Sequence, residues 1–204
     1  AKLMDTELAL DWVRDFGRLS RTDLYIALPT YQLRAGLDQV GELMFLEGEA
    51  TVAATAAAER NLFVPPSEVV EWVSRVSQGK PRWLVGLAWF RLPIAGDRTV
   101  IGMETFLEMT RGRLPEARIE SRIEPTAAGA RSFDVSLINH GPHDEAWPAL
   151  TELPAGCIRG DGVNGFEFDA RIGQFTHEHP GLLRVGQALQ VGWVHCEEID
   201  HAEL

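Results

Sequence analysis

The residues best suited to bind a ligand are an aromatic and a guanidinium group near the end of one apolar segment. Trp89 and Arg91 are two positions apart, so in a strand they point to the same side. Tyr31 and Gln32 follow a second apolar segment at the equivalent point. An indole beside a guanidinium suits stacking on a sugar or clamping of a carboxylate, so these four are the expected substrate-binding residues. The alternative is that Trp89 fills the core and that Arg91 pairs with Asp97 or a backbone carbonyl.

Three carboxylates lie nearest to the expected site, and they are the candidate catalytic residues: Glu47, Glu49 and Asp97. A glycosidase uses two carboxyl groups about 5 to 10 Å apart for acid and base catalysis. The sequence does not fix this distance. The alternative is that each of the three is one of the 30 acidic residues of a solvated surface.

Two close pairs of histidines suggest a metal: His140 with His143, and His177 with His179. Neither pair has the i, i+4 helical spacing of a zinc site or a cysteine companion. The segment 161–165 lacks the regular ligand positions of a calcium loop. The sequence also lacks a nucleophile elbow, a phosphate-binding loop and a dinucleotide motif. No metal and no cofactor is therefore expected.

The segment 83–93, Trp-Leu-Val-Gly-Leu-Ala-Trp-Phe-Arg-Leu-Pro, must position the expected site. Its short apolar run, closed by proline, predicts a strand buried on both faces in a parallel sheet covered by helices. A period of two directs Trp89 and Arg91 toward a crevice, and Gly86 and Ala88 toward a helix. Ligand crevices of α/β sheets lie at the carboxyl ends of the strands, where Arg91 is found.

The elements before residue 114 alternate between helix and strand. We expect a helix over 5–16 that stops at Gly17, a strand over 24–28, a hairpin over 31–49 with its turn at 38–41, a helix between Pro65 and Gly79, and a helix over about 99–110. The Ala-rich stretch 50–60 fits either helix or strand. This alternation with short links is the pattern of an α/β fold.

Beyond residue 114 the pattern changes to short alternating segments divided by turn residues. They lie at 118–124, 132–139, 149–153, 165–175 and 183–196. This spacing predicts an all-β sandwich over 115–204, after an α/β portion over 1–114. Cys157 and Cys196 both fall in this second part, so one disulfide bond between them is an open alternative.

The composition limits the classes of partner. The chain has 204 residues, a formal net charge of −11 and a pI near 5.0, which argues against nucleic acid and anionic membrane surfaces as partners. No apolar run is long enough for a membrane span. The chain begins at Ala1 without an initiator methionine or an apolar leader, which predicts a processed or excised segment.

Several short motifs resemble one known family. They are Gly86-Leu-Ala-Trp-Phe-Arg-Leu-Pro93 followed by Asp97-Arg98, Ala27-Leu-Pro-Thr-Tyr31, Leu137-Ile-Asn-His-Gly141 and Val191-Gly-Trp193. In these motifs the chain resembles the later half of the bacterial family catalogued as domain of unknown function 3142. The resemblance implies part of a glycoside-hydrolase-like (β/α), or TIM-type, barrel with a β-sandwich appended, exported to the periplasm or secreted. It carries over Trp89, Arg91 and Asp97 as motif residues, without an established activity.

The chain departs from this family in the size of its α/β portion. A complete barrel needs about 200 to 250 residues, and the portion before residue 114 supplies only a few of its strands. An incomplete barrel would leave a sheet edge that needs a partner.

Two functions compete. The favoured hypothesis is a non-catalytic extracytoplasmic binding or assembly module, with a carbohydrate-type cleft for a saccharide and a second chain that completes the sheet. The alternative is a glycoside-hydrolase-like enzyme, in which Tyr31 and Trp89 stack on a saccharide and Glu47, Glu49 or Asp97 supplies acid and base catalysis.

Overall fold

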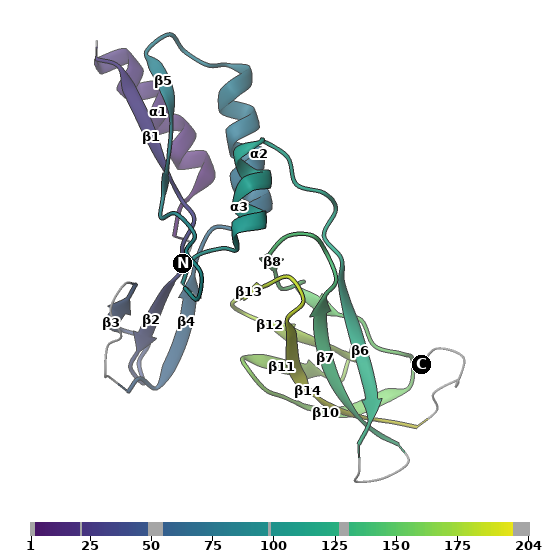
Figure 1. Cartoon of the computed structure of the whole chain (residues 1–204). Helices are drawn as coiled ribbons and strands as arrows, with labels where there is room; N and C mark the ends of the chain where they lie inside the picture. The colour runs from purple at the N-terminus through teal and green to yellow at the C-terminus, as the bar shows by residue number, and fades with distance from the viewer. Residues whose placement is uncertain (1–2, 21, 49–54, 98, 127–130, 198–204) are drawn as a thin grey trace. The chain divides into compact units, whose positions relative to one another are not determined.

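The structure, a computed structural model, describes residues 3–20, 22–48, 55–97, 99–126 and 131–197 (Figure 1). The chain divides into two compact units, Ala1–Pro115 and Glu116–Leu204, here called unit 1 and unit 2. Within the described ranges all helices belong to unit 1, and none of them is long and apolar enough to cross a membrane.

Unit 1 combines helices with two small sheets. Its helices are α1 (Thr6–Leu19), α2 (Pro66–Gln78) and α3 (Met103–Thr110). A parallel sheet is formed by β1 (Leu24–Pro29) and β5 (Leu84–Phe90), and an antiparallel sheet by β2 (Leu33–Leu37), β3 (Leu43–Glu47) and β4 (Ala58–Leu62). In the described part of the chain only β1 and β5 pair in parallel and no barrel closes, so the expected barrel portion is not shown.

Helix α1 begins at a side-chain cap and runs past the expected end. The Oδ1 atom of Asp5 accepts a hydrogen bond from the Leu8 backbone N–H at 2.9 Å, which satisfies a free donor of the first turn. The prediction that the helix stops at Gly17 is wrong. A Cβ atom on Gly17 would lie 1.9 Å from Cε2 of Trp83. Glycine stands there because the Trp83 ring packs directly on the helix backbone.

Helix α2 contributes three buried apolar side chains to unit 1. Val69, Trp72 and Val76 are all buried, as the helical spacing predicts. The indole N–H of Trp72 donates to the backbone carbonyl of Thr6 at 3.1 Å, which joins α2 to α1. Pro66 occupies the first turn, where its missing N–H costs no helical hydrogen bond.

The β1–β5 sheet is covered on one face only. Leu28 on its inner face is fully buried. On the outer face Tyr25 is 63% exposed and Phe90 is 52% exposed. Ala27 and Ala88, which are paired on that same face, are exposed as well. The prediction of a strand buried on both faces is therefore wrong.

The predicted hairpin is confirmed, and a third strand joins it. Oδ1 of Asp38 accepts hydrogen bonds from the backbone N–H groups of Val40 at 2.9 Å and Glu42 at 2.8 Å, and Gly41 has a φ of 85°. Strand β4 includes residues 58–60 of the Ala-rich stretch 50–60, whose conformation the sequence left open, and residues 50–54 of that stretch lie outside the described residues.

Helix α3 begins four residues later than expected. Val100 forms a β-bridge with Tyr31, and the Ile101 N–H donates to the Thr30 carbonyl at 3.0 Å. These contacts hold the chain extended until Gly102.

Unit 2 consists of antiparallel sheets throughout its described residues, which confirms the β character of the second part. The largest sheet has the order β10-β14-β7-β6, formed by Cys157–Gly162, Ala188–Cys196, Ser132–Asn139 and Ile119–Pro125. A second sheet has the order β11-β12-β9, formed by Phe166–Asp169, Gln174–His177 and Leu150–Thr151. Strands β8 (Glu145–Ala146) and β13 (Leu182–Leu183) pair with each other.

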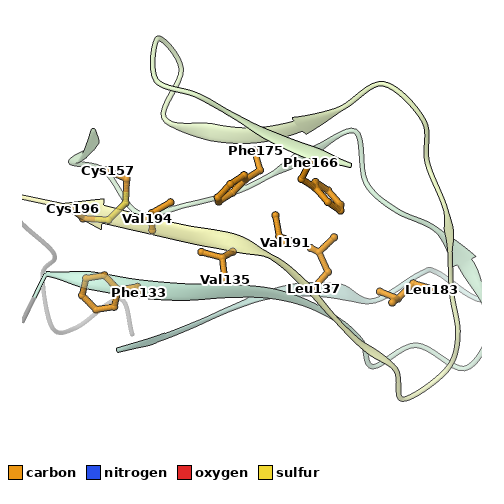
Figure 2. Packing of buried hydrophobic residues seen from close by; sticks show 10 residues of the cluster. All are labelled: Phe133, Val135, Leu137, Cys157, Phe166, Phe175, Leu183, Val191, Val194 and Cys196. Atoms are coloured by element: carbon orange, nitrogen blue, oxygen red, sulfur yellow. A yellow bond between two sulfur atoms is a disulfide. The ribbon is translucent and has the colours of Figure 1, made fainter. Parts of the chain in front are cut away.

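The inner faces of the two larger sheets form the core of unit 2. Figure 2 shows Phe166 and Phe175 of the three-stranded sheet pointing toward Val135 and Val191 of the four-stranded sheet. Phe175, Val135 and Val191 have no exposed surface. The core thus lies between two layers of strands, as the alternating pattern predicts.

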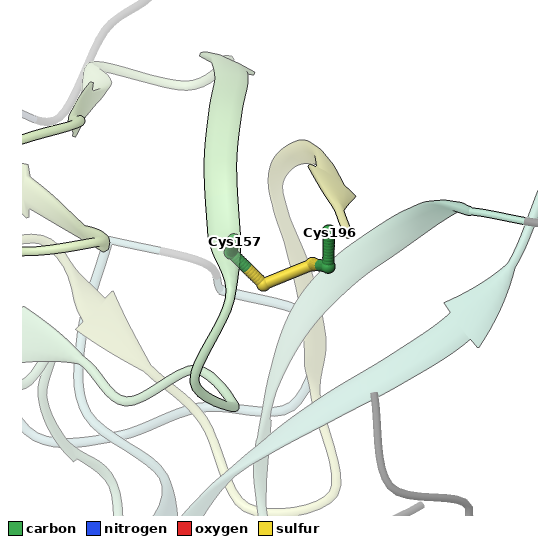
Figure 3. Close-up of a disulfide and its surroundings, with 2 residues drawn as sticks. All are labelled: Cys157 and Cys196. Carbon is green, nitrogen blue, oxygen red and sulfur yellow. A yellow bond between two sulfur atoms is a disulfide. The ribbon is translucent and has the colours of Figure 1, made fainter. Parts of the chain in front are cut away.

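A disulfide bond links two neighbouring strands at the border of this core (Figure 3). Cys157 of β10 is paired directly with Cys196 of β14, and both side chains are buried. The bond closes a loop with a sequence separation of 39 residues. It settles the alternative that the sequence left open.

A buried amide organises the loop that follows β7. Asn139 is 1% exposed. Its Nδ2 donates to the carbonyls of His143 at 2.8 Å and Leu183 at 2.9 Å, and its Oδ1 accepts from the Gly141 N–H at 2.8 Å. These hydrogen bonds satisfy all the groups that a buried amide must pair.

Candidate functional site

The carboxyl ends of β1 and β5 meet at the expected site, and a hydroxyl joins them. The Thr30 N–H donates to the carbonyl of Phe90 at 2.8 Å, and its hydroxyl donates to the carbonyl of Arg91. The backbone N–H of Gln32 donates to the carbonyl of Thr99 at 2.7 Å. The chain after β1 is thereby fixed to the chain after β5, which brings Tyr31 and Gln32 to the same end of the sheet as Arg91.

Arg91, Asp97 and Thr99 form a hydrogen-bond network. Its Nη2 lies 2.7 Å from Oδ2 of Asp97, and its Nη1 donates to the Thr99 hydroxyl at 3.1 Å. The other carboxylate oxygen of Asp97 accepts from the N–H and the hydroxyl of Thr99, both at 2.7 Å. The side chains of Arg91 and Asp97 are only 21% and 11% exposed. The guanidinium is thus neutralised inside the protein, as in the alternative interpretation of the sequence.

Trp89 lies against a helix and not in an open crevice. Its ring meets the ring of Phe106 in α3 edge to face, with centroids 5.8 Å apart and planes at 82°. The alternation along the strand predicts that Trp89 faces a crevice and that Gly86 and Ala88 face a helix. That orientation is wrong, because Ala88 is exposed and the Trp89 side of β5 is the covered one.

The aromatic residues at the open side are instead Tyr31 and Phe90. Their rings lie edge to face, with centroids 5.5 Å apart and planes at 88°. The period of two places Phe90 on the side of Gly86 and Ala88, which was expected to face a helix, so Phe90 was missed. Alternation correctly puts Phe90 and Trp89 on opposite faces of β5. It does not show which of the two faces a helix covers.

The other candidate carboxylates are not brought to Asp97 by any contact within the described residues. Glu47 in β3 forms an ion pair with Arg34 of β2, whose Nε donates to Oε2 of Glu47 at 2.8 Å. Arg34 also pairs with Glu59 of β4 at 2.9 Å. The hydrogen bonds that Arg34 donates to Glu47 and Glu59 raise the pKa of its guanidinium. Glu49 lies outside the described residues.

The histidine pairs have separate structural environments. Nε2 of His143, which is buried, lies 3.5 Å from Oε2 of Glu145. Nε2 of His177 lies 2.9 Å from the carbonyl of Pro148. Among the residues with assigned structure, no three His, Cys, Asp or Glu side chains gather as a metal-binding group.

Unit 1 also exposes large apolar side chains on a helix. Helix α1 exposes a stripe of large side chains one turn apart, with exposed fractions of 46% for Leu8, 66% for Trp12, 46% for Phe16 and 88% for Leu19. We call this set the α1 stripe. Its i, i+4, i+8, i+11 spacing is visible in the sequence, but the sequence does not show that the stripe is uncovered.

The β1–β5 sheet also has unpaired edges and exposed apolar residues. In the described residues, neither β1 nor β5 has a strand on its second edge. After β5, Leu92 is 62% exposed and Ile94 is 66% exposed. We define the open face of unit 1 as the exposed strand residues of the outer sheet face together with these two residues of the following loop. Its members are Tyr25, Ala27, Ala88, Phe90, Leu92 and Ile94.

Comparisons with known families divide the chain in two. Residues 1–95 match the model of a family described as domain of unknown function (DUF3142), and residues 123–197 match a second family, also described as domain of unknown function (DUF8456). No curated protein and no solved structure matches the chain. The first match spans α1 to β5 and ends before Asp97.

These matches support part of the resemblance seen in the sequence and correct the rest. The family predicted for the first part is supported over residues 1–95. The motifs at 137–141 and 191–193, however, fall in the segment that matches the second family. The placement in the later half of the first family and the glycoside-hydrolase-like barrel have no support from the matches.

Proposed function

We propose that this chain is a non-catalytic assembly module, in which unit 1 binds a further α/β polypeptide that adds a strand to the β1–β5 sheet and covers its open face. One observation carries the proposal: a two-stranded parallel sheet with an exposed apolar outer face.

Such a sheet is unusual as an end state in water. Parallel sheets are found with both faces covered, and two strands alone are marginal. Burying a large apolar side chain stabilises by about 1.5 to 3 kcal/mol, and Tyr25, Phe90 and Leu92 each expose more than half of their surface. A polypeptide that covers the open face would gain this contribution.

The geometry favours a larger α/β partner over a second copy of this chain. A twofold dimer that joins two β1 edges would add an antiparallel strand. It would leave each open face and each β5 edge uncovered. A partner that supplies parallel strands with their crossover helices can satisfy the edges, the open face and the α1 stripe together.

The disulfide bond supports a site of action outside the cytoplasm. Cys157 and Cys196 form a buried bond, and such bonds persist mainly in oxidising compartments. We therefore propose that the assembly forms in the periplasm or outside the cell.

The glycoside-hydrolase alternative stays a prediction of the sequence. Asp97 is hydrogen-bonded to Arg91 and Glu47 to Arg34, and Trp89 packs on Phe106. No observation on the described residues favours a saccharide cleft at this end of the sheet, so we do not develop that function.

The experiment places a photo-reactive phenylalanine analogue at Tyr25 and, as a control, at Ile172 of unit 2, which is 52% exposed. Cross-linking is done in the native host, and the attached peptides are identified by mass spectrometry. We expect Tyr25 to capture strand or helix segments of one α/β polypeptide that Ile172 does not capture.

The purified partner is then titrated with the chain and with two matched variants. Phe90→Asp places a charge in the centre of the open face, so we expect binding to weaken at least about tenfold, while Ile172→Asp leaves it unchanged. Self-association of the purified chain through Tyr25, or equal cross-linking at both positions, would contradict the proposal.

A further inference from the structure

The outer face of the four-stranded sheet in unit 2 carries one exposed indole in a row of acidic residues. The strand registers pair Trp193 of β14 with Asp161 of β10 on one side and with Asp134 of β7 on the other. Asp134 is paired in turn with Glu124 of β6. We call Asp161, Trp193, Asp134 and Glu124 the indole row.

Trp193 points away from the core because of a bulge in its strand. The register shifts between Gln190 and Gly192, and both Val191 and Val194 are fully buried. Trp193 between them is 42% exposed. β-Bulges redirect side chains next to binding sites, and a large exposed aromatic in the middle of a polar sheet face is typical of an interaction surface.

The charges beside the indole are available to a ligand. Asp134 and Asp161 are exposed, and within the described residues neither forms a hydrogen bond or an ion pair through its carboxylate. Residues directly opposite in antiparallel strands have Cβ atoms about 4.5 to 5.5 Å apart, so both carboxylates flank the indole closely. Glu124 is different, because Arg122 contacts it at 2.5 Å.

A groove of about 500 Å³ adjoins the indole row on β6 and β7. Glu124 belongs to both the row and the groove, and Glu120, Ile138 and His140 continue the groove lining. Arg122, Ile123 and Pro125 also line the groove, so it combines two carboxylates with a guanidinium and apolar groups along β6. An extended segment bound at Trp193 has room to continue there.

We propose that the indole row binds a polypeptide segment that presents a lysine or arginine side chain. A cation over the indole face is attracted by the ring, and the carboxylates of Asp134 and Asp161 on either side complete the charge complementarity. The surface is an open sheet face rather than an enclosed cavity, which suits a polypeptide better than a small organic cation. A neutral saccharide would not need two unpaired carboxylates.

The test uses a decapeptide of alternating lysine and glycine as the probe, and one of alternating glutamate and glycine as its negative counterpart. Binding to the full chain is measured by calorimetry and by nuclear magnetic resonance shifts of the β14 amides. We expect the lysine peptide to bind at the indole row and the glutamate peptide not to bind. The affinity for the lysine peptide should fall steeply with added salt.

Two variants and two matched controls distinguish binding at the indole row from attraction to the net negative charge of the chain. Trp193→Ala should weaken binding by about fivefold or more, whereas Trp12→Ala, which removes the exposed indole of α1, should not. Asp134→Asn with Asp161→Asn should abolish binding at the row. Glu152→Gln with Glu167→Gln, which changes the net charge equally at other exposed positions, should have less than about a twofold effect.

Three results would overturn the proposal. The first is an equal loss of affinity in the Asp134→Asn/Asp161→Asn and Glu152→Gln/Glu167→Gln variants. The second is an unchanged affinity for the lysine peptide in Trp193→Ala. The third is a shift of the β14 amides with a neutral oligosaccharide but not with the lysine peptide. Thermal unfolding of each variant confirms that the change in binding does not come from loss of the fold.

Discussion

The two units of this chain differ in where they leave large apolar side chains exposed. Unit 2 places its valines, leucines and phenylalanines between two layers of strands and fixes the border with a buried disulfide bond. Unit 1 also buries apolar residues, Trp72 and Leu28 among them, but it exposes both the α1 stripe and the open face. Unit 2 thus has the organisation of a self-sufficient domain, whereas unit 1 has that of a part that needs a partner.

Loss of the disulfide bond should cause the largest change in the stability of unit 2 relative to unit 1. In the chain-entropy model, a bond with a sequence separation of 39 residues stabilises by about 4 kcal/mol. Reduction, or Cys157→Ser with Cys196→Ser, should therefore lower the free energy of unfolding of unit 2. Hydrogen exchange of β7 and α2 peptides measures the two units separately. An equal change in α2 would show that the units are not independent.

Removal of the buried amide should have the next largest effect. Asn139→Ala leaves the carbonyls of His143 and Leu183 without their donor, which should destabilise unit 2 by about 3 kcal/mol. Gln190→Ala, at an exposed position of the same unit, is the control and should change stability by less than about 0.5 kcal/mol. Denaturant unfolding compares them. A similar midpoint for both variants would show that the amide is not important for the loop.

The polar group at the end of β5 should matter less, and only in unit 1. Asp97→Asn removes the charge partner of Arg91, which is partly buried, and should destabilise unit 1 by about 1 to 2 kcal/mol. Asp23→Asn, at an exposed position of unit 1, is the matched control. Exchange rates of β5 amides report the effect. Unchanged rates in Asp97→Asn would mean that the group does not hold the strand ends together.

The smallest effect concerns pH and a surface ion pair of unit 2. Hydrogen bonds from Arg171 lower the pKa of Asp169 from 3.8 to about 2. Because the folded pKa is the lower one, this pair stabilises unit 2 above pH 4, and the contribution disappears as the pH falls toward 2. The Asp169→Asn variant should lack this part of the acid dependence.

A carboxyl titration by nuclear magnetic resonance measures the midpoint of Asp169 directly. The expected midpoint is near 2, and Glu152, an exposed acid of the same unit, serves as the reference. A midpoint near 3.8 would show that Arg171 does not hold the carboxylate in solution.

The helices and strands with strong local signals were predictable from the sequence. Helix α2 follows from Pro65 and Pro66 with an apolar face, and β7 from strict alternation between Ser132 and Asn139. Strand β10 was missed because Arg-Gly-Asp-Gly at 159–162 has no strand-forming pattern. Its place depends on pairing with β14, which is a long-range contact.

At the candidate site, the periodicity of the sequence was not enough to predict which side chains are buried. Alternation along β5 separates Trp89 from Phe90, but both sets are apolar, so the sequence could not decide which face α3 covers. The pair of Arg91 with Asp97 was foreseen only as an alternative. The disulfide bond and the exposure of Trp193 depend on strand register and on a bulge, neither of which the local sequence specifies.

Hydrogen exchange of the purified chain at neutral pH tests the contrast between the units most directly. If unit 1 is an incomplete α/β structure, the amides of β1 and β5 should exchange at least about a hundredfold faster than those of β7 and β14. Protection of β1 and β5 equal to that of β7 and β14, in the chain without any partner, would contradict the assembly function.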